Sequence, residues 1–520
     1  MSAGLVRNTA VVGAMTLVSR VLGLVRDMVF ARFGVDAGMD AFFVAFKIPN
    51  FMRRLFAEGA FSQAFVPVLS EYRTQRDHAE VQALVDRVAG TLAGLLGLLT
   101  LAGVLASPLL VVVFAPGFLS DPLKFDLTAQ MLRFTFPYLL AMALVAFAAG
   151  ILNSYGRFGM VAFTPVWLNL VLIAAALYVA PGLEQPMLAL AWGVLAAGFV
   201  QVLFLLPALR GVRLLPRPRW GLRDAGVRRI LGLMGPGILG SSVAQINLLF
   251  DTLLASFLVT GSVSWLYYAD RLVEFPLGIF GIALGTVILP VLSRNHAGGE
   301  ADAFSHNLDA GLRWVLLIGV PAAIGLILLA RPAVATLFQY DGFSARDVDM
   351  AGLALVAYGL GLPGFMLVKI LAPAFYARQD TRTPVRIAVR ALIANMVLNL
   401  VFVVPLVLMQ VPGAHAGLAL ATALASYLNA GLLYRRLRRD GVYRPQGGWG
   451  VLALRLFAAN AAMAGLLLWG VPAAAEWLAM DGAARAAQIA GWVAAGVVAY
   501  LLALRLTGLR LSVFWSPRTP

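Results

Sequence analysis

The sequence contains no cysteine, and charged residues make up only 12% of its 520 residues. The absence of cysteine excludes disulfides, thiolate catalysis and cysteine-ligated metal sites. Soluble proteins carry about 25% charged residues, whereas this chain is 61% hydrophobic. We therefore expect an all-α polytopic membrane protein.

Residues and motifs for enzymatic chemistry are also scarce. The four histidines, His78, His296, His306 and His415, fall in expected loops or at the edge of an expected span and do not pair as metal ligands. No G-x-x-x-x-G-K-[ST] sequence occurs, which excludes ATP hydrolysis at a P-loop. A membrane glycosyltransferase would need a catalytic acid near a loop, and the candidates form no recognisable pair: Asp121, Asp126, Asp341, Asp347 and Asp349. We expect a transporter without a cofactor, driven by a coupling cation (Na⁺ or H⁺), the membrane potential or removal of product.

The apolar runs give the number of membrane spans. A helix needs about 20 residues to cross the hydrocarbon core, and on that basis the chain has fourteen expected spans. They cover roughly residues 8–34, 38–66, 85–115, 128–153, 159–181, 187–208, 228–259, 264–292, 308–331, 350–376, 384–408, 413–434, 451–471 and 486–507. The start of the chain lacks the features of a cleaved signal peptide, so we expect the first span to be retained.

Basic residues set the expected orientation. The formal net charge is +15, but the arginines gather in short loops, which is typical of membrane proteins rather than of nucleic-acid binding. Every second loop is basic, including the runs 210–229 and 435–444. The opposite loops hold only Lys124, Arg331, Arg346 and Arg485. The positive-inside rule therefore predicts a multi-pass protein with both termini in the cytoplasm.

Two short motifs recur after about 220 residues. The sequence Tyr155-Gly-Arg157 returns as Tyr376-Ala-Arg378, and Pro67-Val-Leu-Ser70 returns as Pro290-Val-Leu-Ser293. The first six spans would then correspond to the next six in the same orientation, an arrangement found in transporters. We predict an N-terminal lobe (1–220), a C-terminal lobe (221–445) and a final segment (446–520) with two extra spans.

The expected second span carries a polar face. Its charged residues are Asp40, Lys47, Arg53, Arg54 and Glu58. All of these except Arg53 are spaced by seven or four residues, so they share one side of a helix. Pro49 in the same span predicts a break or kink. Because the span crosses lipid, we expect this face to line a polar cavity.

Other expected spans carry ionisable residues as well: Arg20, Arg26 and Asp27 in the first, Asp270, Arg271 and Glu274 in the eighth, and Lys369 in the tenth. Each costs about 2.5–3.5 kcal/mol at the centre of a helix in lipid, so these groups must face one another or water. Some acids could form structural ion pairs: Asp27 with Arg26 or Arg20, Glu58 with Arg54, and Glu274 with Arg271. The cations still outnumber the acids by seven to five, which predicts a cavity for an anion. The planar fork of arginine suits phosphate.

Two pairs of polar residues have helical spacing in the expected seventh and eleventh spans. They are Asn247 with Asp251, and Asn395 with Asn399. Four oxygen ligands on two helices could hold Na⁺ or form a proton-linked site. Hydrogen bonding between helices is the alternative explanation.

Four stretches contain most of these charges: Ser19–Asp27, Asp40–Lys47, Arg53–Phe65 and Tyr268–Pro276. They strongly resemble the MurJ (MviN) family of bacterial lipid II flippases, within the multidrug/oligosaccharidyl-lipid/polysaccharide exporter superfamily. The resemblance extends over essentially the whole chain. It implies that the chain moves lipid II, an undecaprenyl pyrophosphate that bears the peptidoglycan disaccharide-pentapeptide, from the inner to the outer leaflet of the bacterial cytoplasmic (inner) membrane by alternating access.

The resemblance also implies roles for residues. Arg20, Arg26 and Arg271 would bind the pyrophosphate, with Lys47, Arg53 and Arg54 in the same cavity. Asp27, Asp40, Glu58, Asp270 and Glu274 would act in gating or in ion pairs. The last two spans would form a groove for the lipid tail, and the family's cation site would fit Asp251 and Asn399. Membrane lipids, and other proteins of cell-wall synthesis, are the remaining expected partners.

Two related transporter functions compete with this one. Exporters of drug cations should have an acidic cavity, which the excess of cations contradicts. An exporter of another glycan linked to a polyprenyl pyrophosphate would share the basic cavity, and only the motifs argue against it.

Overall fold

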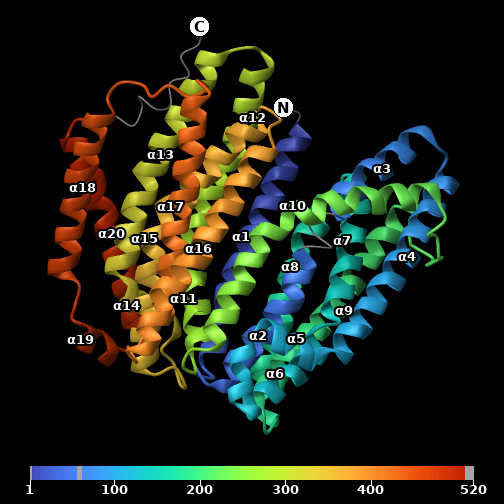
Figure 1. Cartoon of the computed structure of the whole chain (residues 1–520), viewed down its shortest axis with the longest axis horizontal. Helices are drawn as coiled ribbons and strands as arrows, with labels where there is room; N and C mark the ends of the chain where they lie inside the picture. The colour runs from blue at the N-terminus through green and yellow to red at the C-terminus, as the bar shows by residue number, and fades with distance from the viewer. Residues whose placement is uncertain (1–2, 55–60, 510–520) are drawn as a thin grey trace. The chain divides into compact units, whose positions relative to one another are not determined.

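The computed structural model describes residues 3–54 and 61–509, with the backbone alone for residues 3–10, 236–244 and 280–286. Within these ranges the chain forms helices joined by short turns and loops (Figure 1). The helices group into two compact units, Met1–Ser264 and Trp265–Pro520. The all-helical architecture predicted from the sequence is therefore confirmed for the described residues.

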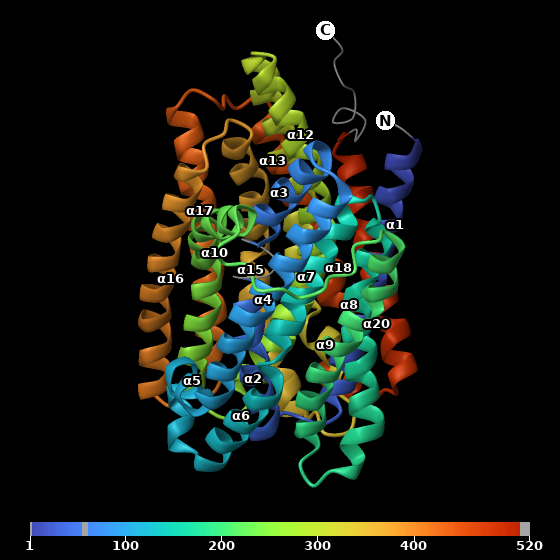
Figure 2. The same cartoon turned by 90° about the vertical axis from the view of Figure 1, so that its right-hand side faces the viewer.

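Among its described residues, the first unit contains ten α-helices and part of an eleventh. They are α1 (Ala3–Ala31), α2 (Ala37–Arg53), α3 (Ser62–Gln75), α4 (His78–Leu105), α5 (Ser107–Phe114), α6 (Pro122–Thr135), α7 (Tyr138–Ser154), α8 (Phe158–Ala174), α9 (Pro186–Gly211), α10 (Ala225–Ser256) and the start of α11 (Ser262–Pro276). Three short helices, η2 (Pro116–Ser120), η3 (Ala175–Val179) and η4 (Ala180–Gly182), complete it. Within this unit α7 packs on α4 and α9, and α8 packs on α1 and α9 (Figure 2).

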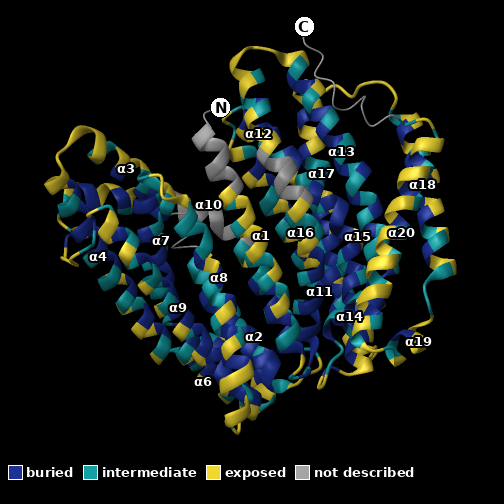
Figure 3. Cartoon of the chain, turned by 180° about the vertical axis from the view of Figure 1, so that it is seen from behind, coloured by how far each residue is buried: buried dark blue, intermediate teal, exposed yellow. Residues whose placement is uncertain are grey.

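The described part of the second unit, up to residue 509, contains the rest of α11, the π-helical turn η5 (Leu277–Gly281) and nine further α-helices. They are α12 (Ile282–Ala297), α13 (Ala301–Leu328), α14 (Ala330–Phe338), α15 (Ala345–Tyr376), α16 (Arg382–Leu408), α17 (His415–Arg439), α18 (Trp449–Gly470), α19 (Ala474–Ala479) and α20 (Gly482–Leu506). Helix α15 is the centre of this unit, because it packs on α12, α13, α14 and α17. Helices α16 and α20 are largely exposed along their apolar lengths, as lipid-facing helices would be (Figure 3).

Each expected span falls on one helix or on consecutive helices, although residues 55–60 of the second span lie outside the described residues. Ten of these, from His78–Leu105 to Gly482–Leu506, are long and apolar enough to cross a membrane. The other four expected spans fall on α1, on α2 with α3, on α10, and on α11 with α12. Fourteen spans are compatible with this arrangement. The lobes predicted from the repeat concern internal sequence similarity and stay a prediction; by packing, α10 belongs with the first unit.

Helix α2 is largely buried within the first unit. Its N-cap residue Asp36 accepts a hydrogen bond from the backbone N–H of Met39 at 2.8 Å. From Met39 to Phe46 every residue is buried. The ring of Phe42 packs edge to face on that of Phe30 of α1, with centroids 5.6 Å apart, and this aromatic contact holds α2 against α1.

Pro49 interrupts the hydrogen bonding of α2, as expected. Proline has no backbone N–H, so the carbonyl of Ala45, four residues earlier, loses its helical donor. The hydroxyl of Thr135 on α6 supplies the missing hydrogen bond to that carbonyl at 2.6 Å. The interruption in α2 is thus compensated by a neighbouring helix.

Replacing Thr135 by Val should expose this dependence. The substitution leaves the Ala45 carbonyl buried without a donor, which costs about 1–3 kcal/mol. Thr128 provides the matched control, since it is equally buried on the same helix, and its hydroxyl bonds to the carbonyl of Lys124 in its own helix. That carbonyl keeps its helical donor in T128V. Thermal unfolding in detergent should show a clearly lower midpoint for T135V than for T128V, and equal midpoints would contradict the explanation.

Candidate functional site

Asp40 lies in the first turn of α2 and is only 1% exposed. Its carboxylate accepts a hydrogen bond from Lys124 Nζ at 2.9 Å. It also accepts bonds from the backbone N–H of Gly261 at 2.7 Å and of Ser264 at 3.0 Å, and from Ser264 Oγ at 2.6 Å. The N–H groups at the start of a helix lack helical partners and carry partial positive charge. Asp40 therefore caps the start of α11 while it neutralises a lysine.

The turn that presents these donors depends on a glycine. Gly261 has a φ of +100°, a left-handed conformation that glycine adopts without the steric penalty of a side chain. Its N–H then points at the Asp40 carboxylate. The sequence predicted that Asp40 faces a polar cavity, whereas here it lies in a closed cluster of donors.

Lys124 was expected in a loop, and the structure places it in the first turn of α6. Asp121 caps this helix by accepting a bond from the Lys124 N–H at 3.1 Å. The ammonium is 4.3 Å from the ring centroid of Phe118, and the residue is 4% exposed. A sequence signal for this location existed, because Lys124, Thr128 and Thr135 recur at helical spacing and lie on one buried face.

Replacing Asp40 by Asn should destabilise the protein more than replacing Lys124 by Met. In D40N the buried ammonium loses its counter-charge, a loss that typically costs about 3–5 kcal/mol. In K124M the carboxylate keeps its three donors at the start of α11. The double variant D40N/K124M should therefore unfold at a higher temperature than D40N in detergent. If K124M were as damaging as D40N, the α11 donors would not be holding the carboxylate.

A second charged cluster surrounds Arg26 on α1. Arg26 donates to Asp27 Oδ1 from Nε at 3.0 Å and from Nη2 at 2.7 Å, and from Nη1 to Asn169 on α8 at 3.1 Å. Asn169 in turn donates to the carbonyl of Ser19 at 3.0 Å. The predicted pairing of Asp27 with Arg26 is confirmed, and both residues are buried. Sequence reasoning missed Asn169, which no motif distinguishes.

The remaining predicted cations of the first unit differ in their surroundings. Arg20 is half-buried and has no hydrogen-bond partner among the described residues. Arg53 is half-buried and donates to Asn50 on its own helix at 3.2 Å. Lys47 is also half-buried, whereas Arg54 is exposed. Glu58, predicted to pair with Arg54, lies outside the described residues.

In the second unit the predicted charges lie on α11. Arg271 Nη1 donates to Glu274 at 3.2 Å, one turn along the helix. The side chain of Arg271 is 29% exposed and that of Glu274 is 49% exposed. Asp270 is half-buried beside them, and Lys369 on α15 is exposed. The predicted pairing of Glu274 with Arg271 is confirmed, and its exposure makes it a weak pair.

The residues of the predicted cation site occupy two helices. Asn399 donates to Asn395 Oδ1 at 2.7 Å, and Asn395 donates to Thr422 on α17 at 3.1 Å. The alternative explanation, hydrogen bonding between helices, thus applies to Asn395, which bonds to α17. Asn247 and Asp251 are half-buried on α10. Among the described residues no three His, Cys, Asp or Glu side chains gather as a metal site.

An apolar cavity of about 650 Å³ lies between α13, α14, α18 and α20. Its lining includes Trp314, Leu317, Met463, Trp492, Gly496 and Tyr500. The Tyr500 hydroxyl donates to the carbonyl of Leu317 at 2.7 Å, which removes its polar group from the apolar wall. The volume lies within the usual range for ligand sites.

The linker before α18 is fixed by Asp309 of α13, which is 2% exposed. Asp309 accepts from Arg313 at 2.7 Å, from the Tyr443 hydroxyl at 2.6 Å and from Trp449 Nε1 at 2.9 Å. Burial, followed by the bond to Asp309, raises the pKa of Tyr443. The phenol therefore stays a hydrogen-bond donor at every physiological pH.

The other end of the helix pair is fixed by Arg485 of α20, which is 6% exposed. Its guanidinium donates four hydrogen bonds to backbone carbonyls. The acceptors are those of Trp477 at 3.1 Å, Leu478 at 2.7 Å, and Ala335 and Gln339 at 3.3 Å each. These carbonyls end α14 and α19, where the helix dipole is negative. Sequence reasoning missed both Asp309 and Arg485, because their partners come from distant segments.

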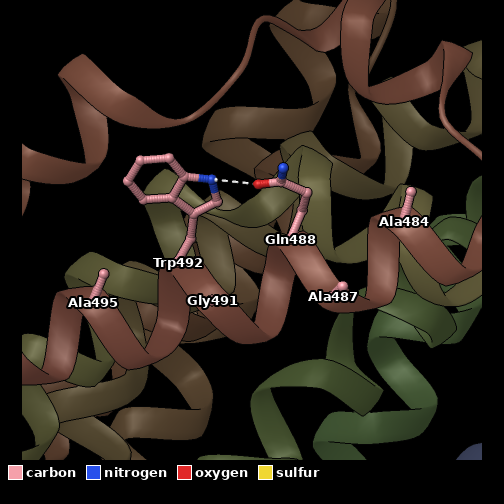
Figure 4. Close-up of a pocket in the computed structure, with 6 residues that line it drawn as sticks. All are labelled: Ala484, Ala487, Gln488, Gly491, Trp492 and Ala495. Carbon is pink, nitrogen blue, oxygen red and sulfur yellow. Dashed lines mark hydrogen bonds between the residues drawn. The ribbon is translucent and has the colours of Figure 1, made fainter.

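A further pocket of about 450 Å³ lies along α20 (Figure 4). Its lining consists of Ala484, Ala487, Gln488, Gly491, Trp492 and Ala495. Trp492 Nε1 donates to Gln488 at 3.1 Å (Figure 4). Trp492 also belongs to the wall of the larger cavity. The two pockets thus adjoin the same tryptophan.

Comparison with known proteins gives one consistent result. A family described as "Lipid II flippase MurJ" matches residues 29–487. The chain is 48% identical to the "Probable lipid II flippase MurJ" of Vibrio cholerae over 98% of both chains. It is 45% identical to the "Lipid II flippase MurJ" of Burkholderia cenocepacia over 89% of this chain and 90% of that protein.

Solved structures agree on the fold. A structure of "Lipid II flippase MurJ, inward closed conformation" aligns with a TM-score of 0.78 at 24% identity, over 95% of this chain and 97% of that one. An inward-facing multidrug resistance transporter of the MATE family aligns with a TM-score of 0.62 at 16% identity, over 83% and 98% of the two chains. These two alignments support the fold described above. With the family match and the identities above, the chain belongs to the lipid II flippase MurJ family.

Proposed function

We propose that the chain is a lipid II flippase of the bacterial membrane, which carries lipid II from the inner to the outer leaflet by alternating access. The observation that carries this proposal is the 48% identity to a lipid II flippase over 98% of both chains. The function is transport, not catalysis.

The charged residues would serve the pyrophosphate of the substrate. Arg271 is well placed among the described arginines, because its side chain is 29% exposed and its ion pair is with a half-exposed glutamate on its own helix. Arg20 is half-buried and also available to an anion. Arg26 would have to exchange Asp27 or Asn169 for phosphate. Lys47, Arg53 and Arg54 would add positive charge, while Asp27, Asp40, Glu58, Asp270 and Glu274 would hold ion pairs that change during the cycle.

The apolar cavity of the C-terminal helices would accept part of the prenyl tail. Its walls are almost entirely hydrocarbon, and it is bounded by α18 and α20, the two spans that follow the repeat. The hydrogen bonds of Asp309 at one end of these helices and of Arg485 at the other would hold the helices in place and keep the cavity open in the absence of lipid. Because the tail would otherwise lie among equally apolar lipid chains, the cavity would favour it through packing contacts and not through its removal from water.

Energy, orientation and partners complete the proposal. An ion gradient or the membrane potential would drive the cycle, with Asn247, Asp251, Asn395 and Asn399 as candidate ligands for Na⁺. The lobes 1–220 and 221–445 would move against each other, with both termini in the cytoplasm. The enzymes that build peptidoglycan from lipid II would be the protein partners.

Translocation of lipid II in cells whose only flippase is this chain tests the proposal directly. Wild type should move lipid II, and R271A should reduce transport about tenfold or more, because a charge-assisted bond to phosphate is lost. R331A is the control, since Arg331 is likewise an arginine of the second unit in an ion pair, with Asp349. Wild type that moves no lipid II would overturn the proposal, and another polyprenyl-linked glycan would become the leading cargo. R271A that matched R331A would remove Arg271 from the substrate site.

Two glycines on α20 allow a separate test of the tail cavity. A Cβ at Gly496 would contact Leu467 and Met463 at 3.6 Å, inside the cavity, whereas at Gly491 it would meet nothing within 4 Å. G496L should therefore fill part of the cavity and lower lipid II transport severalfold, in proportion to the apolar contact denied to the tail. G491L makes the same change on the same helix, in the pocket of Figure 4, and should leave transport near the wild-type rate. Equal rates for the two variants would exclude the cavity from the transport path.

A further inference from the structure

The linker between α9 and α10 is pinned along α4. The side chain of Gln82 donates to the carbonyl of Leu215 at 3.0 Å. Asp86 accepts the N–H of Arg217 at 2.8 Å through its carboxylate, and the N–H of Arg219 at 2.9 Å through its backbone carbonyl. The linker thus follows α4 away from its N-terminus instead of leaving into solvent.

The linker then reaches its deepest point and returns. A side chain on Gly90 would overlap with the backbone of Arg219, and one on Gly94 would overlap with the ring of Trp220. Gly221 donates to Thr91 at 3.1 Å, and Asp224 pairs with Arg87 closer to the start of α4. Two glycines of α4 therefore form a seat for the tip of the linker, which is Trp220.

The depth of the tip follows from the sequence of α4. Beyond Arg87 the helix has no charged residue up to its end at Leu105, so Arg87 marks the headgroup layer and the hydrocarbon of the membrane begins further along the helix. Gly94 is seven residues further, about 10 Å along the axis. The interfacial layer of a bilayer is about 5–7 Å thick on each side. Trp220, which is 59% exposed, thus lies at the boundary between headgroups and acyl chains, where tryptophan is enriched.

The arginines beside the tip differ in whether their side chains bind other described residues. Arg229 is engaged by Glu71 at 2.8 Å, and Arg87 is engaged by Asp224. The exposed side chains of Arg217, Arg219 and Arg223 form no ion pair or hydrogen bond with the described residues. Arg223 and Trp220 line a pocket of about 650 Å³ together with Arg87, Gly221, Leu222 and Asp224.

We propose that this pocket binds the phosphate headgroup of an anionic membrane phospholipid, with Arg223 on the phosphate, Arg219 adding positive charge next to the pocket lining, and Trp220 against the glycerol and upper acyl chains. The exposed tryptophan at interfacial depth favours a lipid over a soluble anion. A bound lipid would contact that ring with its glycerol and acyl chains, whereas a soluble anion has no apolar part to contact it. Exposed apolar side chains continue below the tip on α4, at Leu95 and Leu98. The linker is then a membrane anchor that selects for charge, and this role does not depend on the proposed cargo.

Depth-sensitive quenching tests the proposal. The chain has no cysteine, so P218C places a single fluorophore on the exposed linker, outside the pocket lining. The labelled full-length protein is reconstituted in phosphatidylcholine vesicles that contain equal fractions of either 5-doxyl-phosphatidylglycerol or 5-doxyl-phosphatidylcholine. Quenching by the anionic lipid should exceed quenching by the neutral lipid about twofold or more, since each arginine near the surface attracts anionic lipid.

Matched variants separate a site from general surface charge. R219Q/R223Q should remain quenched by both lipids, at a ratio near one. R438Q/R439Q removes two exposed arginines from the end of α17 and should keep the wild-type ratio. Excess inorganic phosphate should leave that ratio unchanged. The proposal is overturned by equal quenching in wild type, by no quenching with either lipid, by a loss of preference in R438Q/R439Q, or by competition from inorganic phosphate, which would mark a site for a soluble anion.

Discussion

The requirement that a buried charge has a partner governs the described structure. An ionised group loses several kcal/mol of hydration when it leaves water, and only close partners repay that loss. Asp40 meets the requirement with a lysine and with the free N–H groups at the start of α11. The same hydrogen bonds that stabilise the buried carboxylate also fix where α11 begins. The need to stabilise a buried charge therefore helps to determine the position of a helix.

The two fastenings of the C-terminal helices meet the same requirement with different chemistry. Asp309 uses an arginine and two aromatic side-chain donors. Arg485 instead uses carbonyls that end two helices, which carry partial negative charge without a carboxylate. Between them the helices are held largely by apolar contacts, and there the cavity opens. Directional polar bonds at both ends allow loose packing in the middle.

Hydropathy and charge spacing predicted the helices and the local pairs, because both depend on neighbours in the sequence. Arg26 with Asp27, and Arg271 with Glu274, are adjacent or one turn apart, so spacing alone identified them. The partner of Asp40 escaped prediction. Lys124 is 84 residues away. When membrane spans are assumed to end at charged residues, Lys124 is assigned to a loop. Tertiary contacts of this kind, like those of Arg485, are chosen by packing and leave little trace in local pattern.

The pairing seen here changes what the excess of cations means for an anionic substrate. An arginine whose partner is buried and well bonded must give up that partner before it can bind phosphate, and Asp27 would then be buried and unpaired. The pair of Arg271 with Glu274 is half-exposed, and such pairs contribute about 0–1 kcal/mol. Under the proposed function, phosphate would compete with this glutamate at little cost. The proposed binding would therefore favour arginines in exposed pairs, and the buried pairs of Arg26 and Asp40 would exchange partners only with a movement of the surrounding helices.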